Sequence, residues 1–224
     1  MPRPILFDLD GTLIDSIELI QRSKDHAFRV RGRPVPSDEE WLTGIGIPLT
    51  TMFERYAAYD ADVAEFIREY RAYQLPNHDR LVRGYDGALE TLTALRELGH
   101  PIAIVTSKSV ELSRRGLTHV GLAHLIDTIV GCDSCTNHKP HPEPVLMALE
   151  RLGHAPEAAV FIGDSVHDMH AGKAAGVITV AALWGPFTRQ ELLRSDPGYF
   201  LDRVAELPAL LARLDRETGR PGAA

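Results

Sequence analysis

Short apolar runs alternate with segments of helical periodicity along most of this chain. The apolar runs have the character of buried strands and lie at residues 5–9, 102–105, 126–130, 159–162 and 177–182. Four segments with helical periodicity precede the four later runs and lie at residues 89–98, 110–120, 142–152 and 167–175. The first of these segments follows a predicted capping residue, Asp86. Strands joined by crossover helices predict a parallel sheet with helices on both faces, so we expect a doubly wound, Rossmann-like α/β fold.

The segment between the first two apolar runs has a different pattern. It shows helical periodicity from about residue 15 to residue 82 and no strand-like run. The expected helices run from a cap at Asp15-Ser16 to residue 30, from a capping box at Ser37 and Glu40, and over residues 49–59 and 61–73. Because the first apolar run belongs to the sheet, residues 15–82 are predicted to form a small helical domain inserted into a core of residues 1–14 and 83–224.

The composition is that of a globular protein. The chain has 224 residues, of which 44% are hydrophobic, and a net charge of -7. This length allows one core and a modest second domain. The excess of acidic over basic residues and the lack of a Lys/Arg cluster argue against a nucleic-acid partner. With no apolar run of about 18 residues and no signal peptide after Met1, we expect a cytoplasmic protein that does not bind membranes. Residues 220–224 are expected to be a frayed tail.

The two cysteines lie in a pattern that invites a zinc interpretation. Cys132, Cys135, His138 and His141 form C-x2-C-x2-H-x2-H, and all four residue types bind zinc. Structural zinc sites usually separate the two ligand pairs by a longer loop, and this spacing therefore disfavours zinc. A redox Cys-x-x-Cys is expected at a helix N-terminus, which is not the position here. We therefore expect reduced, structural thiols.

Two aspartates lie at the carboxyl end of the first apolar run. Asp8 and Asp10 are separated by one residue and precede Gly11, at the end of a predicted strand where open α/β sheets bind ligands. At an effective dielectric constant near 20, two like charges about 4 Å apart repel by roughly 4 kcal/mol. We therefore expect a cation between them. A surface turn of the Asp-Gly kind is the alternative for this stretch.

Further polar residues follow the later strands. They share a position at or just beyond a predicted strand end, or in the loop before the next helix, and are Thr106, Ser107, Lys139, Asp164 and Asp168. Because the carboxyl ends of parallel strands meet at one edge of the sheet, we expect these side chains to converge on the first aspartate pair. The alternatives are a solvated surface position for Lys139 and a helix-capping role for Asp168.

This set of side chains favours phosphoryl transfer assisted by a metal ion. Several carboxylates without clustered histidine or cysteine suit a hard dication, and Mg2+ that keeps some waters and binds a substrate phosphate oxygen fits best. One carboxylate can attack phosphorus to give an aspartyl-phosphate, while a second acid protonates the leaving oxygen. A lysine, a hydroxyl group and backbone N–H groups can then neutralise the transferred phosphoryl group.

The ordered motifs resemble those of a known family. The motifs are Asp8-x-Asp10-Gly11-Thr12, Thr106-Ser107, Lys139-Pro140 and Gly163-Asp164-x3-Asp168. Together they resemble the haloacid dehalogenase superfamily, in particular its phosphatases with a helical cap after the first motif, and the resemblance covers nearly the whole chain. It implies that Asp8 is the nucleophile and Asp10 the general acid/base. It also implies a phosphoryl site made by Thr106, Ser107 and Lys139, and a Mg2+ site made by Asp8, Asp164, Asp168 and the backbone carbonyl of Asp10.

The resemblance also bears on the substrate. Residues 70–73, followed by His78-Asp79, and residues 136–146 are similar to bacterial inorganic pyrophosphatases of the superfamily, close kin of phosphoglycolate phosphatases, although His138 and His141 depart from that pattern. We expect a phosphohydrolase for a small phosphorylated metabolite, with Gly44 and Gly46 as candidate substrate-binding residues or as parts of a plain turn. A phosphosugar mutase and a non-catalytic phosphate-binding module are the alternatives. The sequence does not distinguish a monomer from a homodimer.

Overall fold

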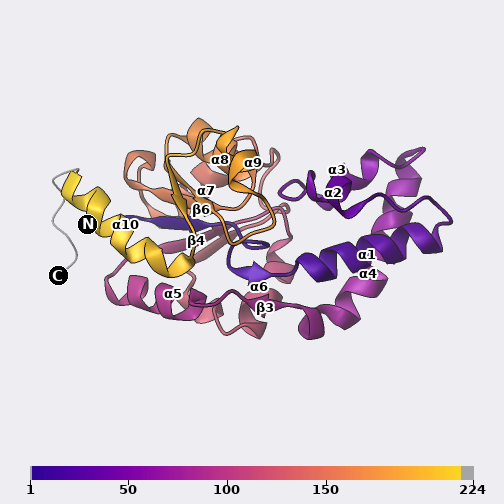
Figure 1. The fold of residues 1–224 in the computed structure, drawn as a ribbon, viewed down its shortest axis with the longest axis horizontal. Coiled ribbons are helices and arrows are strands. Elements are labelled where there is room, and N and C mark those ends of the chain that lie inside the picture. Colours follow the sequence, from indigo (N-terminus) through magenta and orange to yellow (C-terminus); the bar gives the residue numbers. More distant parts are fainter. Residues whose placement is uncertain (1, 218–224) are drawn as a thin grey trace.

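The computed structural model describes residues 2–217 and contains a six-stranded parallel sheet (Figure 1). The order of the strands is β5-β4-β1-β6-β7-β8. Their bounds are β1 (Ile5–Phe7), β4 (Ile102–Val105), β5 (Thr128–Val130), β6 (Val160–Gly163), β7 (Ile178–Ala182) and β8 (Tyr199–Leu201). Because β1 pairs with both β4 and β6, the residues that follow β1 lie at the middle of the carboxyl edge of the sheet.

Helices cover both faces of this sheet (Figure 1). One face packs against α5 (Ala88–Glu97), α6 (Val110–His119) and α10 (Leu207–Glu217), and the other against α7 (Glu143–Leu152) and α8 (Val166–Ala175). Successive side chains of a strand point to opposite faces, and accordingly Ile5 and Phe7 pack with the first set of helices and Leu6 with the second. The predicted doubly wound α/β fold is confirmed.

The helices of the inserted segment extend from one side of the sheet (Figure 1). They are α1 (Ile17–Val30), α2 (Asp38–Leu42), α3 (Leu49–Glu54) and α4 (Asp60–Leu81), and they are called the cap below. The cap has its own core, which is rich in aromatic side chains and contains Phe28, Trp41, Phe53, Phe66 and Tyr70. The two ends of the cap segment meet in a short antiparallel pair formed by β2 (Ile14–Asp15) and β3 (Arg83–Gly84).

Two cap helices differ in length from the prediction. α4 continues to Leu81 although it contains Pro76, which has no backbone N–H to donate to a helical hydrogen bond. The buried side chains of Tyr70, Gln74 and His78 recur every fourth residue, so one face of α4 stays packed through this point. The predicted helix at 49–59 is shorter in the structure, where α3 ends at Glu54 and, beyond it, the N–H of Ala58 donates to the carboxylate of Asp62 (3.0 Å).

The structure changes the picture at two predicted helix caps. At the predicted Asp15-Ser16 cap, the hydroxyl group of Ser16 donates to the Asp10 carboxylate and makes no capping bond, whereas Asp15 Oδ1 accepts from the N–H of Ile17 at the start of α1 (3.3 Å). Asp86 does not cap α5, since the N-cap residue is Gly87 with a φ of 80°, a left-handed conformation that glycine adopts without a steric cost. The capping contact at Ser37 is present, because its hydroxyl group accepts from the N–H of Glu40.

Elements near the C-terminus extend the fold beyond the last predicted strand. α9 (Arg189–Leu193) follows β7, β8 pairs with β7, and α10 contributes leucines to the core. The predicted frayed tail at residues 220–224 lies outside the described residues. Within residues 2–217, no helix has the length and apolar character needed to cross a membrane.

Candidate active site

A tight turn after β1 positions Asp8. The N–H of Asp8 still belongs to the sheet and donates to the carbonyl of Ile162 in β6 (2.9 Å). Gly11 follows with a φ of 83°, and a Cβ added there would lie 2.4 Å from an oxygen of Asp164. Glycine is therefore required both for the backbone conformation and for space. The turn brings the chain after β1 directly against the chain after β6.

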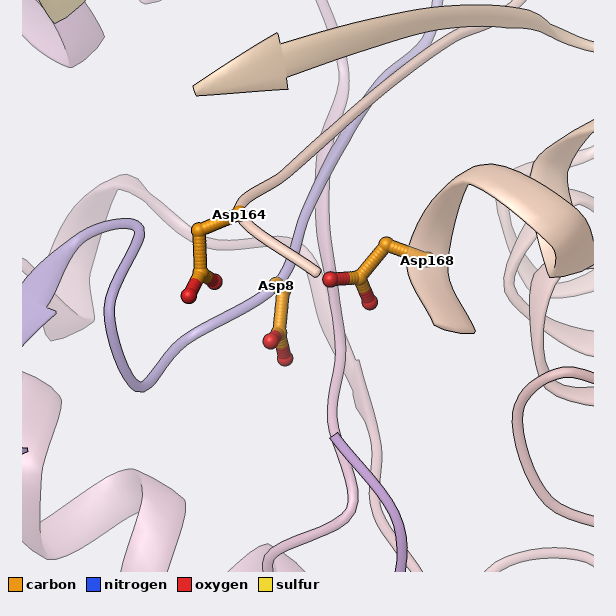
Figure 2. Close-up of side chains that lie close together, drawn as sticks. All are labelled: Asp8, Asp164 and Asp168. Carbon is orange, nitrogen blue, oxygen red and sulfur yellow. The ribbon is translucent and has the colours of Figure 1, made fainter. Parts of the chain in front are cut away.

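Three carboxylates meet at the carboxyl edge of the sheet (Figure 2). Asp8 follows β1, Asp164 follows β6, and Asp168 lies in the first turn of α8. All three residues are buried, and one oxygen of each lies within 4.8 Å of the others. Among residues 2–217, no other group of acidic, histidine or cysteine side chains comes together in this way. These aspartates are called the acidic triad below.

Lys139 is the cation that lies within the acidic triad. Its Nζ atom lies 2.9 Å from Asp8 Oδ1 and 2.6 Å from Asp168 Oδ1, and the side chain is almost fully buried. Burial disfavours the charged form, but the carboxylates of Asp168 and Asp8 outweigh this effect and raise the pKa of Lys139. Asp168 also accepts from the N–H and hydroxyl group of Ser165 at the start of α8. Asp168 therefore combines the helix-capping role with an ion pair.

One lysine does not balance three buried carboxylates. Burial raises the pKa of Asp8 to about 7. The positive charge of Lys139 lowers this pKa and the negative charge of Asp168 raises it, but burial is the largest effect. Burial and the charges of Asp8 and Asp168 likewise raise the pKa of Asp164 well above its usual range. Thr12 donates to Asp164 Oδ1 (2.9 Å), whereas the buried Oδ2 atom has no hydrogen-bond partner among the described residues.

The triad fits a hard divalent cation. Its donors are carboxylate oxygens, which Mg2+ prefers, and buried carboxylates without enough positive charge are costly for the folded state. The free Oδ2 atom of Asp164 is an acceptor that such an ion would satisfy. Asp8, Asp164 and Asp168 are therefore the side chains that could hold a metal ion, while the side chain of Asp10 lies outside this group.

Asp10 has its own partners. Its Oδ1 atom accepts from the hydroxyl group of Ser16 (2.5 Å) and from Nζ of Lys108 (2.6 Å). Sequence reasoning missed Lys108, although this residue directly follows Thr106-Ser107 at the end of a predicted strand. The pairing gives Asp10 a cationic neighbour separate from Lys139, so the two aspartates that are adjacent in sequence lie in different electrostatic environments.

The predicted phosphoryl and substrate residues join the core to the cap. Thr106 is buried at the end of β4, and its hydroxyl group accepts from the N–H of Lys108 (3.2 Å). Ser107 donates to the carbonyl of Gly46 in the cap (2.5 Å). A Cβ on Gly46 would lie 2.8 Å from Ser165 Oγ, so a side chain there would push the cap loop off the core. At Gly44 the added Cβ would instead strike the sulfur atom of Met52 within the cap.

A cavity of about 80 Å³ lies between the core and the cap. This is room for several water molecules or one small ligand. Core residues that line it include Asp8, Asp10, Thr106, Ser107 and Lys108, and cap residues include Trp41, Gly44, Gly46, Tyr70, Arg71 and Gln74. Sequence reasoning did not assign a role to Trp41, Arg71 or Gln74, because their positions on helices give no sign of which residues face the core.

Within the described part of the chain, the four side chains of the C-x2-C-x2-H-x2-H motif do not come together as a group of candidate metal ligands. Cys132 and Cys135 are free thiols, and burial raises the pKa of both, so they are held in the protonated form. Cys135 Sγ lies 3.2 Å from the carbonyl of Asn137, and His141 Nδ1 accepts from the N–H of Glu143 (3.1 Å). These contacts order the loop before α7.

The raised pKa of Asp8 predicts how the stability of the metal-free protein depends on pH. In the unfolded chain this carboxyl group loses its proton near pH 3.8, whereas in the folded protein it keeps the proton to about pH 7. The folded state therefore binds more protons between these values, and its stability should fall as pH rises through this window, by up to about 1.4 kcal/mol per pH unit for each proton. Urea unfolding in EDTA at several pH values measures this slope, and stability that rises from pH 4 to pH 7 would contradict it.

Comparison with known proteins agrees with the arrangement of motifs and fold. The family model for haloacid dehalogenase-like hydrolases matches residues 5–182. The pyrophosphatase PpaX of Bacillus velezensis is 40% identical over 203 residues, which cover 91% of this chain and 93% of that protein. The PpaX of Bacillus pumilus is 38% identical over 208 residues, with 92% and 95% coverage. The crystal structure of a predicted phosphoglycolate phosphatase from Haemophilus somnus superposes with a TM-score of 0.83, at 27% identity and with 93% and 97% coverage. The resemblance stated from the motifs is confirmed, and this chain belongs to the haloacid dehalogenase-like hydrolase family.

Proposed function

We propose that the protein is a Mg2+-dependent phosphohydrolase that forms an aspartyl-phosphate and acts on inorganic pyrophosphate or a phosphoglycolate-type monoester. The observation that carries the proposal is the buried acidic triad with one lysine at the end of β1, beside a separately paired Asp10. The names of the relatives, pyrophosphatase PpaX and predicted phosphoglycolate phosphatase, support this choice of substrates.

The residues of the chain divide the reaction into two steps. An oxygen of Asp8 attacks phosphorus, the bond from phosphorus to the leaving oxygen breaks, and Asp10 donates a proton to that oxygen. Asp10 then takes a proton from water, the water oxygen attacks the same phosphorus, and Asp8 is released with inorganic phosphate. Lys108 holds Asp10 in place, while Thr106 and Lys139 neutralise the phosphoryl oxygens. Bound Mg2+ would add positive charge where the transferred group is most negative.

The cap completes the site in this proposal. Residues 15–82 act as a domain that closes over the carboxyl edge of the sheet and excludes water from the reacting phosphoryl group. The bond between Ser107 and Gly46 supports this role, because it joins the core to the cap loop at the rim of the cavity. Opening of this contact would admit the substrate and release the products.

The substrate proposal predicts a steep preference for small compounds. Because cap residues, among them Trp41, Gly44 and Tyr70, line the cavity directly beside Asp8, we expect kcat/KM for pyrophosphate or phosphoglycolate to exceed that for hexose phosphates by about 100-fold. Phosphate release with Mg2+ from a panel of these compounds measures the ratio, with the Asp8→Asn protein as the blank. Isomerisation of a sugar phosphate without net phosphate release would indicate a mutase. Tight phosphate binding without turnover of any compound would indicate a non-catalytic module.

The metal proposal predicts stabilisation by Mg2+. A ligand that binds only the folded state stabilises it by about 2.7 kcal/mol at a hundredfold excess over Kd, which corresponds to a rise in Tm of about 5–10 °C for a chain of this size. Thermal unfolding over a Mg2+ titration measures the shift, with NaCl at matched ionic strength as the control. The Asp164→Asn protein should lose most of the response. A Tm that does not respond to Mg2+ would contradict the proposed site.

A further inference from the structure

The cap side of the active-site cavity carries a cation that the proposed steps at phosphorus leave unused. Arg71 lies on α4 and lines the same cavity as Asp8 and Asp10. Within residues 2–217, Arg71 forms no ion pair with a carboxylate, whereas other cap arginines such as Arg31 and Arg68 do. Its guanidinium group bonds to the side chain of Gln74 and lies 5.9 Å from the ring centroid of Tyr70.

Gln74 orients this guanidinium group. Its side-chain oxygen accepts from Arg71, and the residue is only 4% exposed. Since that oxygen is occupied, the amide nitrogen of Gln74 remains available as a donor. The pair therefore presents a fixed positive charge and N–H groups, and no negative charge, on the cap side of the cavity.

Trp41 lies on the same side of the cavity. It lines the cavity, is 1% exposed, and its Nε1 atom has no hydrogen-bond partner among the described residues. A buried N–H group without a partner is costly unless a ligand supplies an acceptor. The acids of the cavity, Asp8 and Asp10, come from the core and not from the cap. The cap side is thus suited to an anion.

We propose that Arg71, oriented by Gln74 and assisted by Trp41, binds a second anionic group of the substrate. This inference rests on the proposed function, since it requires the reacting phosphoryl group to lie at Asp8. Because Arg71 lines the same cavity as Asp8, the second group belongs to the same small compound as the reacting phosphoryl group. The second phosphoryl group of pyrophosphate and the carboxylate of phosphoglycolate share this chemistry, and a guanidinium group can bind either with two parallel hydrogen bonds.

Kinetics with matched substrates test the assignment. Pyrophosphate and phosphoglycolate carry the second anionic group, and ethyl phosphate, of similar size, lacks it. We expect Arg71→Met to lower kcat/KM for the first two by about 10- to 100-fold, the value of a hydrogen bond between charged groups, and to change ethyl phosphate by less than about threefold. A loss confined to pyrophosphate or to phosphoglycolate would identify the second group as phosphoryl or carboxylate.

The matched control is Arg68→Met, one helical turn earlier on α4. Arg68 is exposed and paired with Glu69, so its replacement should leave all three substrates unchanged. Arg71→Lys keeps the charge without the planar donor pair and should restore only part of the activity. An equal loss for ethyl phosphate and for the two substrates with a second anionic group, or no loss for any of them, would overturn the assignment.

A binding measurement separates this assignment from the proposed function. If the unmodified protein released phosphate from none of the three compounds, the proposed function would be wrong. Calorimetry with the Asp8→Asn protein, which cannot turn over, still tests the anion site. Adding Arg71→Met should weaken pyrophosphate binding by about tenfold or more and leave inorganic phosphate binding unchanged. Unchanged pyrophosphate affinity would overturn the site.

Discussion

Replacement of Asp8 with asparagine is expected to abolish phosphate release from every substrate. The amide would keep the shape of the side chain but not the nucleophilic oxygen, so kcat should fall on the order of 10⁴-fold or more. The fold should survive, because the backbone N–H at this position still donates to Ile162 and Lys139 keeps Asp168 as an ion-pair partner. Phosphate release under saturating substrate measures the first effect, and circular dichroism with thermal unfolding measures the second.

Asp202→Asn is the matched control for this variant. Asp202 is exposed and lies 3.7 Å from Arg189 on the surface, so the same chemical change there should leave kcat and Tm close to those of the unmodified protein. An Asp8→Asn protein with full activity would exclude the covalent mechanism. An inactive but unfolded variant would show that Asp8 supports the fold and would not test the nucleophile, so both measurements are made on the same preparation.

Replacement of Lys139 with methionine is expected to have the largest effect on stability. It leaves the buried carboxylates of Asp8 and Asp168 without their shared cation. Removing one partner of a buried ion pair typically costs about 3–5 kcal/mol. Activity should also fall, by about 10²–10³-fold, the effect of losing one group that stabilises transition-state charge.

The pH dependence of this loss distinguishes electrostatics from packing. Carboxyl groups whose folded-state pKa is raised contribute stability at low pH and lose it as pH rises. The destabilisation by Lys139→Met in EDTA should therefore be larger at pH 8 than at pH 5, and Mg2+ should reverse part of it. Lys173→Met, at an exposed lysine of α8 that pairs with Asp196, is the matched control. A loss of stability independent of pH would assign Lys139 a packing role only.

The parallel sheet and the positions of the polar residues along it follow from local sequence patterns. Strand and helix periodicity depends on side chains a few residues apart, and it predicted β1, β4, β6 and the helices between them. The motif residues could be found because each follows a strand end, and the topology of parallel strands brings such ends together. The cap predicted at Asp86 is wrong because the turn at Gly87 decides that helix start. At Asp15-Ser16, the contact of Ser16 with Asp10 leaves the capping hydrogen bond to Asp15 alone.

The sequence by itself determined the fold class, the family and the set of acids at the sheet edge. Only the tertiary structure decided how charges pair within that set. Lys108 reaches Asp10 across 98 residues of sequence, and Arg71 on the cap shares a cavity with Asp8 of the core. Periodicity carries no information about such pairs, because they depend on distances between side chains on separate elements. Burial then sets the pKa of Asp8 and Asp164, since desolvation depends on the whole surrounding structure.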